Sequence, residues 1–515
     1  MMKPFKIFLT FFSILALIVL ISYFFPPNGI QITSDFKLKF PTWNQLVDYE
    51  EKEYKDISNI VQRNMPVDTV APAIQDTTPV APDKDTLVSS RDSADTTLID
   101  TLNQGNQAGK TAQANPLQYP DNNPEVLYPF FNSLEKLHHN NELIRILHYG
   151  DSQIEGDRIS SYIRNQLQKK FGGAGIGLFP VVLPHNTNIS LKHSLSSGWE
   201  RYTLHDLEQA NFRHKRFGVL MSFSRFSPYY SNYQNEVYEA WVTIRSSPIA
   251  FDLSSEYTQC RILYGYNEKP FITKMNYGGK TEEADMLPPS NSLKEVGWEI
   301  SKSVDQFTLG FQGNHSPDIY GITLDGEQGI ALDNIPLRGS SGTDFTKTDT
   351  SFFRTMLGKL NVKLIILHFG VNLVPVVRDN YNFYEERFYN QLKMFKSFNK
   401  DLSVIVMGVT DMSKKEGGQY VSYPNISKIR DAQKNAAFRA DCAFWDSYQA
   451  MGGKNSMPSW VFADPPLARK DFTHFTYKGS VVISKMFYKA LMRDYQNYKK
   501  NTRQKQIIST KEDSS

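Results

Sequence analysis

Residues 143–153 read LIRILHYGDSQ, a largely apolar run of strand length that ends at Gly150 and is followed by Asp151 and Ser152. The run at 143–149 predicts a short buried strand, and the pattern at 157–171 predicts a helix behind it. A strand that leads directly into a helix is typical of a parallel α/β sheet, and such sheets bind ligands at the carboxyl ends of their strands. The sequence therefore places Ser152 at an edge where chemistry is expected.

The same alternation continues on both sides of this stretch. Between residues 181 and 329 the period changes to two, which is typical of half-buried antiparallel strands and predicts a β-rich, sandwich-like insertion. We therefore predict an α/β fold in two parts, 123–180 and 330–496, interrupted by that insertion. The other predicted elements are helices at 126–138, 383–398, 428–439 and 477–495 and strands at 364–369 and 402–407.

The N-terminal segment indicates the compartment. Residues 7–25 form an almost wholly apolar run of 19, and at about 1.5 Å per residue a helix of this length crosses a bilayer core. Lys3 and Lys6 precede the run and the next charge is Asp35, so the rest of the chain is expected outside the cytoplasm. A cleaved signal peptide is the alternative, but no A-x-A-like site follows. We predict a single-pass signal anchor in the cytoplasmic membrane, with an extracytoplasmic, periplasmic catalytic domain.

Amino-acid composition indicates a linker between the apolar N-terminal run and the α/β part of the chain. Residues 66–118 contain no aromatic residue and are rich in Thr, Asp, Ala and Pro, which is typical of a linker. The predicted organisation is completed by a cytoplasmic N-terminus at 1–6, the transmembrane helix at 7–25, a juxtamembrane segment at 26–62, a disordered linker at 63–122 and a polar tail at 497–515.

Charge and cysteine content argue against several classes of function. With 57 Lys and Arg against 54 Asp and Glu, the chain lacks the basic excess expected of a protein that binds nucleic acid. Cys260 and Cys442 lie far apart without a Cys/His cluster, so no metal site is expected; two separate buried thiols are favoured over a bridge. The glycine-rich residues 172–177 follow a helix rather than a strand, so we interpret them as a loop and not as a dinucleotide site.

A serine attacks an ester effectively only when a base accepts its proton and donors stabilise the oxyanion. Residues 471–474 read DFTH, so Asp471 can hold one ring nitrogen of His474 while the other faces Ser152. Asn372 follows the strand at 364–369 and offers a side-chain amide at the same edge. Residues 334–339, NIPLRG, add Gly339, whose N–H can approach a ligand closely.

Along the chain these motifs form a serine, a glycine, an asparagine and a histidine block. In that order they resemble the SGNH hydrolase family, also called GDSL-type esterases, which carry the four blocks on one flavodoxin-like α/β domain. The resemblance implies a nucleophilic serine, a histidine base with an orienting carboxylate, an oxyanion hole, and no metal or organic cofactor. Gly342 competes with Gly339, and GDSQ departs from the usual GDSL. The residues implied are Ser152, His474 and Asp471 for catalysis, and the N–H groups of Ser152 and Gly339 with the side chain of Asn372 for the oxyanion hole.

Residues 451–460, MGGKNSMPSW, together with the glycine loop and the insertion, are similar to exported bacterial O-acetylesterases that act on peptidoglycan and related glycans. The first hypothesis is therefore an esterase that removes acetyl groups from a glycan through an acetyl-serine intermediate. A second is an extracytoplasmic acetyltransferase that works with a multi-spanning membrane acyltransferase, and a third is an inactive glycan-binding protein. Arg338 can contact an anionic part of the substrate or form a structural salt bridge. His148 and His368 are expected to form a polar pair across neighbouring strands.

Overall fold

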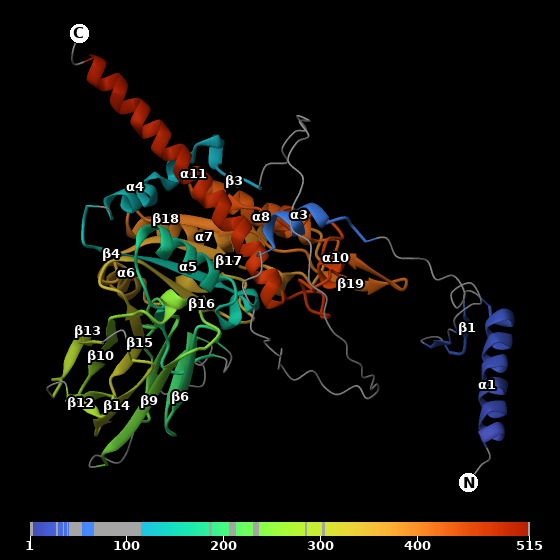
Figure 1. The fold of residues 1–515 in the computed structure, drawn as a ribbon, viewed down its shortest axis with the longest axis horizontal. Helices are drawn as coiled ribbons and strands as arrows, with labels where there is room; N and C mark the ends of the chain where they lie inside the picture. Colours follow the sequence, from blue (N-terminus) through green and yellow to red (C-terminus); the bar gives the residue numbers. More distant parts are fainter. Residues whose placement is uncertain are drawn as a thin grey trace, which may run out of the picture. The chain divides into compact units, whose positions relative to one another are not determined.

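The structure is a computed structural model in which two separate compact units are recognised, residues 1–54 and 55–515 (Figure 1). The first contains α1 (Pro4–Phe24) and a two-stranded sheet of β1 (Ile30–Gln31) and β2 (Lys37–Leu38). Among the helices within the described ranges, none combines the length and the apolarity that a membrane span requires. Of the predicted linker, residues 66–114 lie outside the described residues. The structure describes residues 4–26, 29–33, 36–38, 40, 54–65, 115–137, 139–184, 188–204, 213–229, 236–283, 286–300 and 304–512.

The second unit is built on a six-stranded sheet. Its strands lie in the order β16 (Gly329–Pro336), β4 (Leu143–Gly150), β17 (Val362–His368), β18 (Ser403–Met407), β21 (Ala443–Trp445) and β3 (Leu117–Gln118). The first five are parallel, and β3 runs antiparallel to β21. Numbered along the chain, the parallel strands have the flavodoxin-like order 2-1-3-4-5. The topological switch point, where the order of the strands reverses, lies between β4 and β17. The predicted α/β class with a parallel sheet is therefore confirmed, and Ser152 follows one of the two strands at this reversal.

Helices cover both faces of this sheet, which explains why its strands read as continuous apolar runs. In β4, Ile144 and Ile146 pack on one face and Leu147 and Tyr149 on the other, as the period of two requires. The first face carries α4 (Tyr128–Lys136), α5 (Ser160–Phe171) and α11 (Tyr477–Glu512). The second carries α6 (Thr350–Lys359), α7 (Asn382–Phe398) and α8 (Ile426–Arg439).

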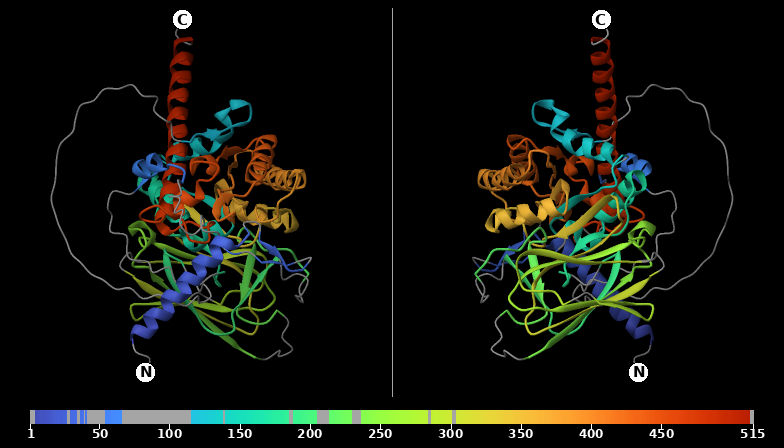
Figure 2. Two further views of the ribbon diagram at one scale, coloured as in Figure 1. Left: turned by 90° about the vertical axis from the view of Figure 1, so that its right-hand side faces the viewer. Right: turned by 90° about the vertical axis from the view of Figure 1, so that its left-hand side faces the viewer.

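The last helix is longer than the sequence pattern suggested. We expected a helix to 495 and a polar tail without structure at 497–515, but α11 continues to Glu512 and runs beyond the body of the unit (Figures 1 and 2). Residues 496–512 contain no Gly or Pro and several good helix formers, so nothing in them ends the helix. Tyr498 is also buried, with its ring 4.9 Å from that of Tyr128.

The segment after β5 (Gly177–Phe179) forms two antiparallel sheets (Figure 2). Buried side chains from both sheets, among them Val242, Leu309 and Ile322, make one core, so the insertion is a sandwich. One sheet comprises β13 (Ser290–Glu299), β10 (Gln259–Asn267), β15 (Asp318–Asp325), β8 (Ser222–Arg225) and β7 (Glu200–Thr203), with β5 paired to β15. The other comprises β12 (Lys280–Glu283), β11 (Ile272–Tyr277), β14 (Gln306–Gly313), β9 (Tyr238–Ser246) and β6 (Leu191–Leu195).

A buried charge cluster joins the sandwich to the parallel sheet. Arg145 on β4 lies 2.6 Å from Asp325 on β15 and 2.5 Å from Asp333 on β16. Arg261 on β10 also reaches Asp325, at 3.1 Å. Buried charges require such partners, so these contacts fix the insertion to the catalytic part within one compact unit.

Two smaller features complete the unit. The helix α3 (Ser58–Asn64) begins in the predicted juxtamembrane segment and ends two residues into the predicted linker. It packs on α11, and Lys489 Nζ donates to Asn64 Oδ1 at 3.0 Å. Cys260 and Cys442 are both free and buried, which confirms the favoured prediction of two separate thiols.

Candidate active site

Ser152 lies in the loop that follows β4, where it begins a short 3-10 helix, η3 (Ser152–Asp157). Asp151 fixes this loop, because its carboxylate accepts the backbone N–H of Gln153 at 3.0 Å, of Gly370 at 3.1 Å and of Val371 at 3.3 Å. Burial raises the pKa of Asp151 to about 6, although the three N–H groups act in the opposite direction. One buried carboxylate thus joins the serine loop to the loop after β17.

His474 contacts both of its predicted partners. Its Nε2 lies 2.8 Å from Ser152 Oγ, and its Nδ1 lies 2.8 Å from Asp471 Oδ2. The other carboxylate oxygen of Asp471 accepts the backbone N–H groups of Thr473 and His474, both at 2.9 Å. Burial alone would raise the pKa of Asp471, but the hydrogen bonds from His474 and Thr473 lower it to about 2. An ionised carboxylate therefore orients an imidazole whose far nitrogen can accept the serine proton.

The structure distinguishes between the two glycines that competed for the oxyanion hole. Both have positive φ, +77° at Gly339 and +78° at Gly342. A Cβ on Gly342 would lie 2.7 Å from the Phe369 ring, and its N–H already donates to Ser340 Oγ at 3.0 Å. Around Gly339, a Cβ would meet nothing within 4 Å. In the part of the chain that the structure describes, neither the N–H of Gly339 nor that of Ser152 donates to a protein acceptor. Gly339 is thus the glycine with an N–H available for a ligand.

Asn372 lies in η7 (Val371–Leu373), directly after the residues held by Asp151. Its Nδ2 donates to the carbonyl of Ser340 at 2.8 Å, which brings it beside the Gly339 loop. A side-chain amide carries two N–H groups, so the second can face a developing oxyanion. The loops that carry the predicted oxyanion donors therefore meet at one sheet edge, joined through Asp151 and Ser340.

Arg338 precedes Gly339 and is 65% exposed, with its Nε 3.6 Å from Glu155. The predicted salt bridge is therefore present, and exposure leaves the guanidinium accessible as well. A cavity of about 280 Å³ opens beside this loop. Its lining comes from the catalytic part at Pro336, Leu337, Arg338, Ser340 and Asp344, and from the sandwich side at Pro184, Arg201, Thr203, Leu204 and Met221.

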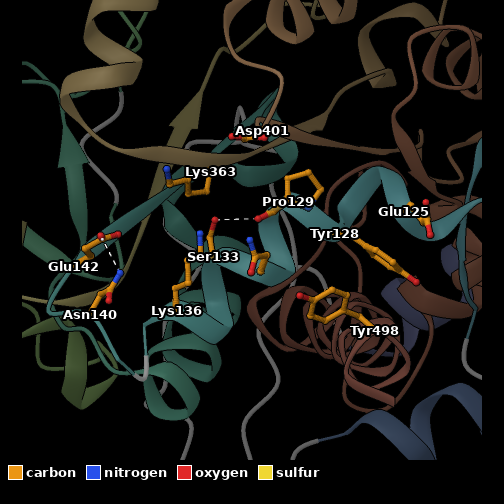
Figure 3. Close-up of a pocket in the computed structure, with 11 residues that line it drawn as sticks. Glu125, Tyr128, Pro129, Ser133, Lys136, Asn140, Glu142, Lys363, Asp401 and Tyr498 are labelled. Atoms are coloured by element: carbon orange, nitrogen blue, oxygen red, sulfur yellow. Dashed lines mark hydrogen bonds between the residues drawn. The ribbon is translucent and has the colours of Figure 1, made fainter. Parts of the chain in front are cut away.

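A larger cavity of about 690 Å³ lies elsewhere (Figure 3). Its lining includes Glu142 just before β4, Lys363 near the start of β17 and Asp401 just before β18. These positions are at the amino ends of the parallel strands, whereas Ser152 follows a carboxyl end. The Ser152–His474 contact and the larger cavity therefore lie at opposite edges of the parallel sheet.

His148 and His368 lie on neighbouring strands β4 and β17, with stacked rings whose centroids are 5.9 Å apart. Burial lowers the pKa of His368 to about 4 and that of His148 well below its usual value, so both are neutral. His148 Nδ1 lies 2.9 Å from Ser160 Oγ. The pair is part of the sheet interior below the site.

Three residues of the site were missed by sequence reasoning. Asp151 and Gln153 belong to the quoted motif, yet only the serine was assigned a role. Arg158, six positions after the serine, donates to the carbonyls of Ser152 and Phe475 at 3.1 Å and 2.9 Å. The departure of GDSQ from GDSL was the available signal for Gln153.

No family model matches the chain, and no curated protein matches it either. Among solved structures, "Peptidoglycan O-acetylesterase in action" is 19% identical with a TM-score of 0.56, over 72% of this chain and 96% of that one. A GDSL-like lipase from Parabacteroides merdae is 14% identical with a TM-score of 0.25, over 31% of this chain and 72% of that one. A carbohydrate esterase family 3 protein from Talaromyces cellulolyticus is 15% identical with a TM-score of 0.23, over 32% and 72%. The first likeness shows that the chain shares its fold with that O-acetylesterase, and the strand order 2-1-3-4-5 is the flavodoxin-like order that the predicted resemblance to SGNH, or GDSL-type, hydrolases implies.

Proposed function

We propose that this protein is a serine esterase that removes O-acetyl groups from a cell-envelope glycan, either peptidoglycan or a related polysaccharide. The observation that carries the proposal is the hydrogen-bonded chain from Asp471 through His474 to Ser152, with 2.8 Å at each side of the imidazole. The fold shared with a peptidoglycan O-acetylesterase supports the choice of an acetylated glycan.

The reaction follows from this geometry. Ser152 Oγ attacks the acetyl carbonyl carbon and its proton passes to His474 Nε2, while Asp471 stabilises the imidazolium. The N–H groups of Ser152 and Gly339 and the amide of Asn372 stabilise the oxyanion. The ester C–O bond then breaks, and the sugar oxygen takes the proton from His474. Water then attacks the acetyl carbon and gives a proton to His474. The bond between that carbon and Ser152 Oγ breaks, Oγ takes the proton back from His474, and acetate leaves.

We assign substrate contact to Arg338 and to the cavity beside it. The exposed guanidinium stands next to Gly339 in sequence, so it can bind a carboxylate of the glycan close to the reacting ester. Arg338→Gln should raise KM for an anionic glycan several-fold while leaving KM for a small neutral acetyl ester unchanged. An equal effect on both substrates would remove this assignment.

The purified full chain is to be tested with O-acetylated peptidoglycan and with a soluble acetyl ester, with Ser152→Ala alongside. Free acetate and acetylated acceptor are both quantified. We expect acetate release that disappears in Ser152→Ala. Serine-dependent acetyl on an acceptor would instead support the transferase with a membrane acyltransferase partner, and glycan binding without turnover would support the inactive binding protein.

The cellular location is a separate proposal that rests on the sequence. We infer an extracytoplasmic, periplasmic catalytic domain with an N-terminal anchor from the apolar run at 7–25 and the lysines before it. Protease treatment of intact spheroplasts should digest the domain after residue 55 if it lies outside. Full protection, with digestion only after lysis, would overturn this location.

A further inference from the structure

Three successive carbonyls around the catalytic histidine each accept a hydrogen bond from elsewhere in the catalytic unit. The carbonyl of Thr473 accepts Gln153 Nε2 at 2.7 Å, and that of Phe475 accepts Arg158 Nη1 at 2.9 Å. The carbonyl of His474 itself accepts the N–H of Arg469 at 2.8 Å. The two outer donors are side chains of the serine loop and of the turn between η3 and α5. The histidine is thus held on both sides by the segment that carries its partner Ser152.

Secondary structure does not supply this restraint. Residues 469–476 form a loop whose only ladder contact, within the described residues, is one isolated bridge between Ala468 and Phe475. The serine loop lies 320 positions away from Thr473 in sequence. Outside its own segment, the backbone of the 469–476 loop accepts the N–H of Ser413 at the Phe472 carbonyl, at 3.1 Å. Within the described residues, the hydrogen bonds that join this loop to the serine loop, including the 2.8 Å contact of Ser152 Oγ with His474 Nε2, all involve side chains.

Both side chains are suited to this task. Gln153 is buried, and its Nε2 uses both N–H groups, on the Thr473 carbonyl and on Thr410 Oγ1 at 3.2 Å. Arg158 spans two carbonyls at once, because its other terminal nitrogen donates to Ser152 at 3.1 Å. A rigid planar guanidinium that binds Ser152 and Phe475 together fixes the separation of the two loops.

We propose that Gln153 and Arg158 are positioning residues that set the Ser152–His474 distance. The inference rests on the proposed serine chemistry and extends it to two residues that touch neither substrate nor reacting atoms. Placement errors of about 1 Å in such constellations reduce rates by up to about 100-fold, so small displacements of His474 matter.

The test uses the full chain with Gln153→Leu, Arg158→Lys and a control, Gln168→Leu. Gln168 on α5 is also buried and also donates from Nε2 to two backbone carbonyls, Gly175 at 3.0 Å and Ile330 at 3.3 Å, away from His474. Each variant is measured for Tm, for kcat and KM on a soluble acetyl ester, and for its rate of reaction with a fluorophosphonate. In that reaction the Oγ–P bond forms, the P–F bond breaks, fluoride leaves, and the serine proton passes to His474.

We expect Gln153→Leu to lower kcat and the phosphonylation rate together by about 10- to 100-fold with KM nearly unchanged. Arg158→Lys should also lower kcat and the phosphonylation rate with KM nearly unchanged, but to a smaller degree, because an ammonium cannot bridge both carbonyls. If Gln153→Leu does not fold, Arg158→Lys alone tests the proposal. Gln168→Leu should lower Tm about as much as Gln153→Leu does, but it should leave kcat and the phosphonylation rate within twofold of the wild type.

If Gln153→Leu and Arg158→Lys both have a lower Tm but retain the phosphonylation rate of the wild type, Gln153 and Arg158 are structural only and the proposal is overturned. The probe reaction also separates this outcome from failure of the proposed function. It needs no glycan, so a wild-type serine that reacts shows activation whatever the natural substrate is. A wild-type chain that does not react with the fluorophosphonate would overturn both the proposed esterase function and the positioning role of Gln153 and Arg158.

Discussion

Arg145 on β4 and Asp325 on β15 form a buried ion pair with 2.6 Å between their charged atoms, and through it the catalytic sheet and the inserted sandwich share one charged cluster. Asp333 accepts from the same guanidinium and also accepts the N–H of Leu178 at 2.8 Å. The insertion is thus held by desolvated charges as well as by apolar packing, which makes it part of the frame of the site.

Removing the arginine should therefore destabilise the whole unit. Arg145→Met leaves the buried Asp333 without its cation and leaves Asp325 with only the partly exposed Arg261, and we expect a loss of about 3–5 kcal/mol in the free energy of unfolding. Arg261→Met is the control, because Arg261 meets the same Asp325 from a partly exposed position and should cost about 1 kcal/mol or less. Chemical denaturation of both variants measures the difference. Equal losses would show that the cluster is not held by Arg145.

The substitution Asp471→Asn tests the proposed role of Asp471 in orienting His474. The change removes the charge that holds His474 Nδ1–H, and we expect kcat to fall by about 10²- to 10⁴-fold with little change in KM. The side chain is 45% exposed, so stability should change little. Because the pKa of Asp471 is about 2, the wild-type carboxylate stays ionised down to about pH 3, and the effect should persist across neutral and mildly acidic pH.

The control for that substitution is Asp464→Asn, at an exposed position on the same segment. It should retain full activity. A kcat for Asp471→Asn within threefold of the wild type would mean that another group orients His474.

The two glycines of the oxyanion loop should respond differently to alanine. Both substitutions place a Cβ at positive φ, which costs about 1–3 kcal/mol. Gly342→Ala adds a clash with the Phe369 ring, so its loss of unfolding free energy should exceed that of Gly339→Ala by about 1–3 kcal/mol. Gly339→Ala should instead lower kcat, because its methyl group would project into the open space beside the N–H that is proposed to stabilise the oxyanion. Denaturation and kinetics on both variants check the contrast, and the reverse ranking would return the oxyanion role to Gly342.

The parts predictable from sequence are those that local pattern encodes. The apolar run at 143–149 became β4, and the position of Ser152 after it followed from strand length and glycine. The DFTH block gave the His474–Asp471 contact because three positions in a loop bring the two side chains together. The strand order then brought Asn372, which follows β17, to the sheet edge that carries Ser152.

Contacts between distant segments could not be read in this way. Arg145 stands within an apolar run, and nothing near it identifies carboxylates 180 and 188 positions later as its partners. Gln153 and Arg158 bind backbone carbonyls, which every residue possesses, so their partners leave no trace in residue type. The extra length of α11 was missed because its tail is polar, whereas helix continuation requires only good helix formers without a terminating Gly or Pro.

The buried carboxyl of Asp151 predicts a specific pH dependence of stability. Its pKa is raised by burial from 3.8 to about 6, so between these values the folded state binds a proton that the unfolded state has released. The corresponding stabilisation is complete below about pH 4 and is lost as the pH rises through about 6.

The Asp151→Asn variant provides the reference for this effect, because its side chain cannot titrate. The unfolding free energy of the wild type relative to Asp151→Asn should therefore fall by about 1.4 kcal/mol per pH unit between pH 4 and 6 and level off above pH 7. Denaturation curves at pH 4, 5, 6, 7 and 8 measure this difference. A constant difference across the series would show that the N–H groups of Gln153, Gly370 and Val371 fully offset the burial of the charge, and that Asp151 is ionised throughout.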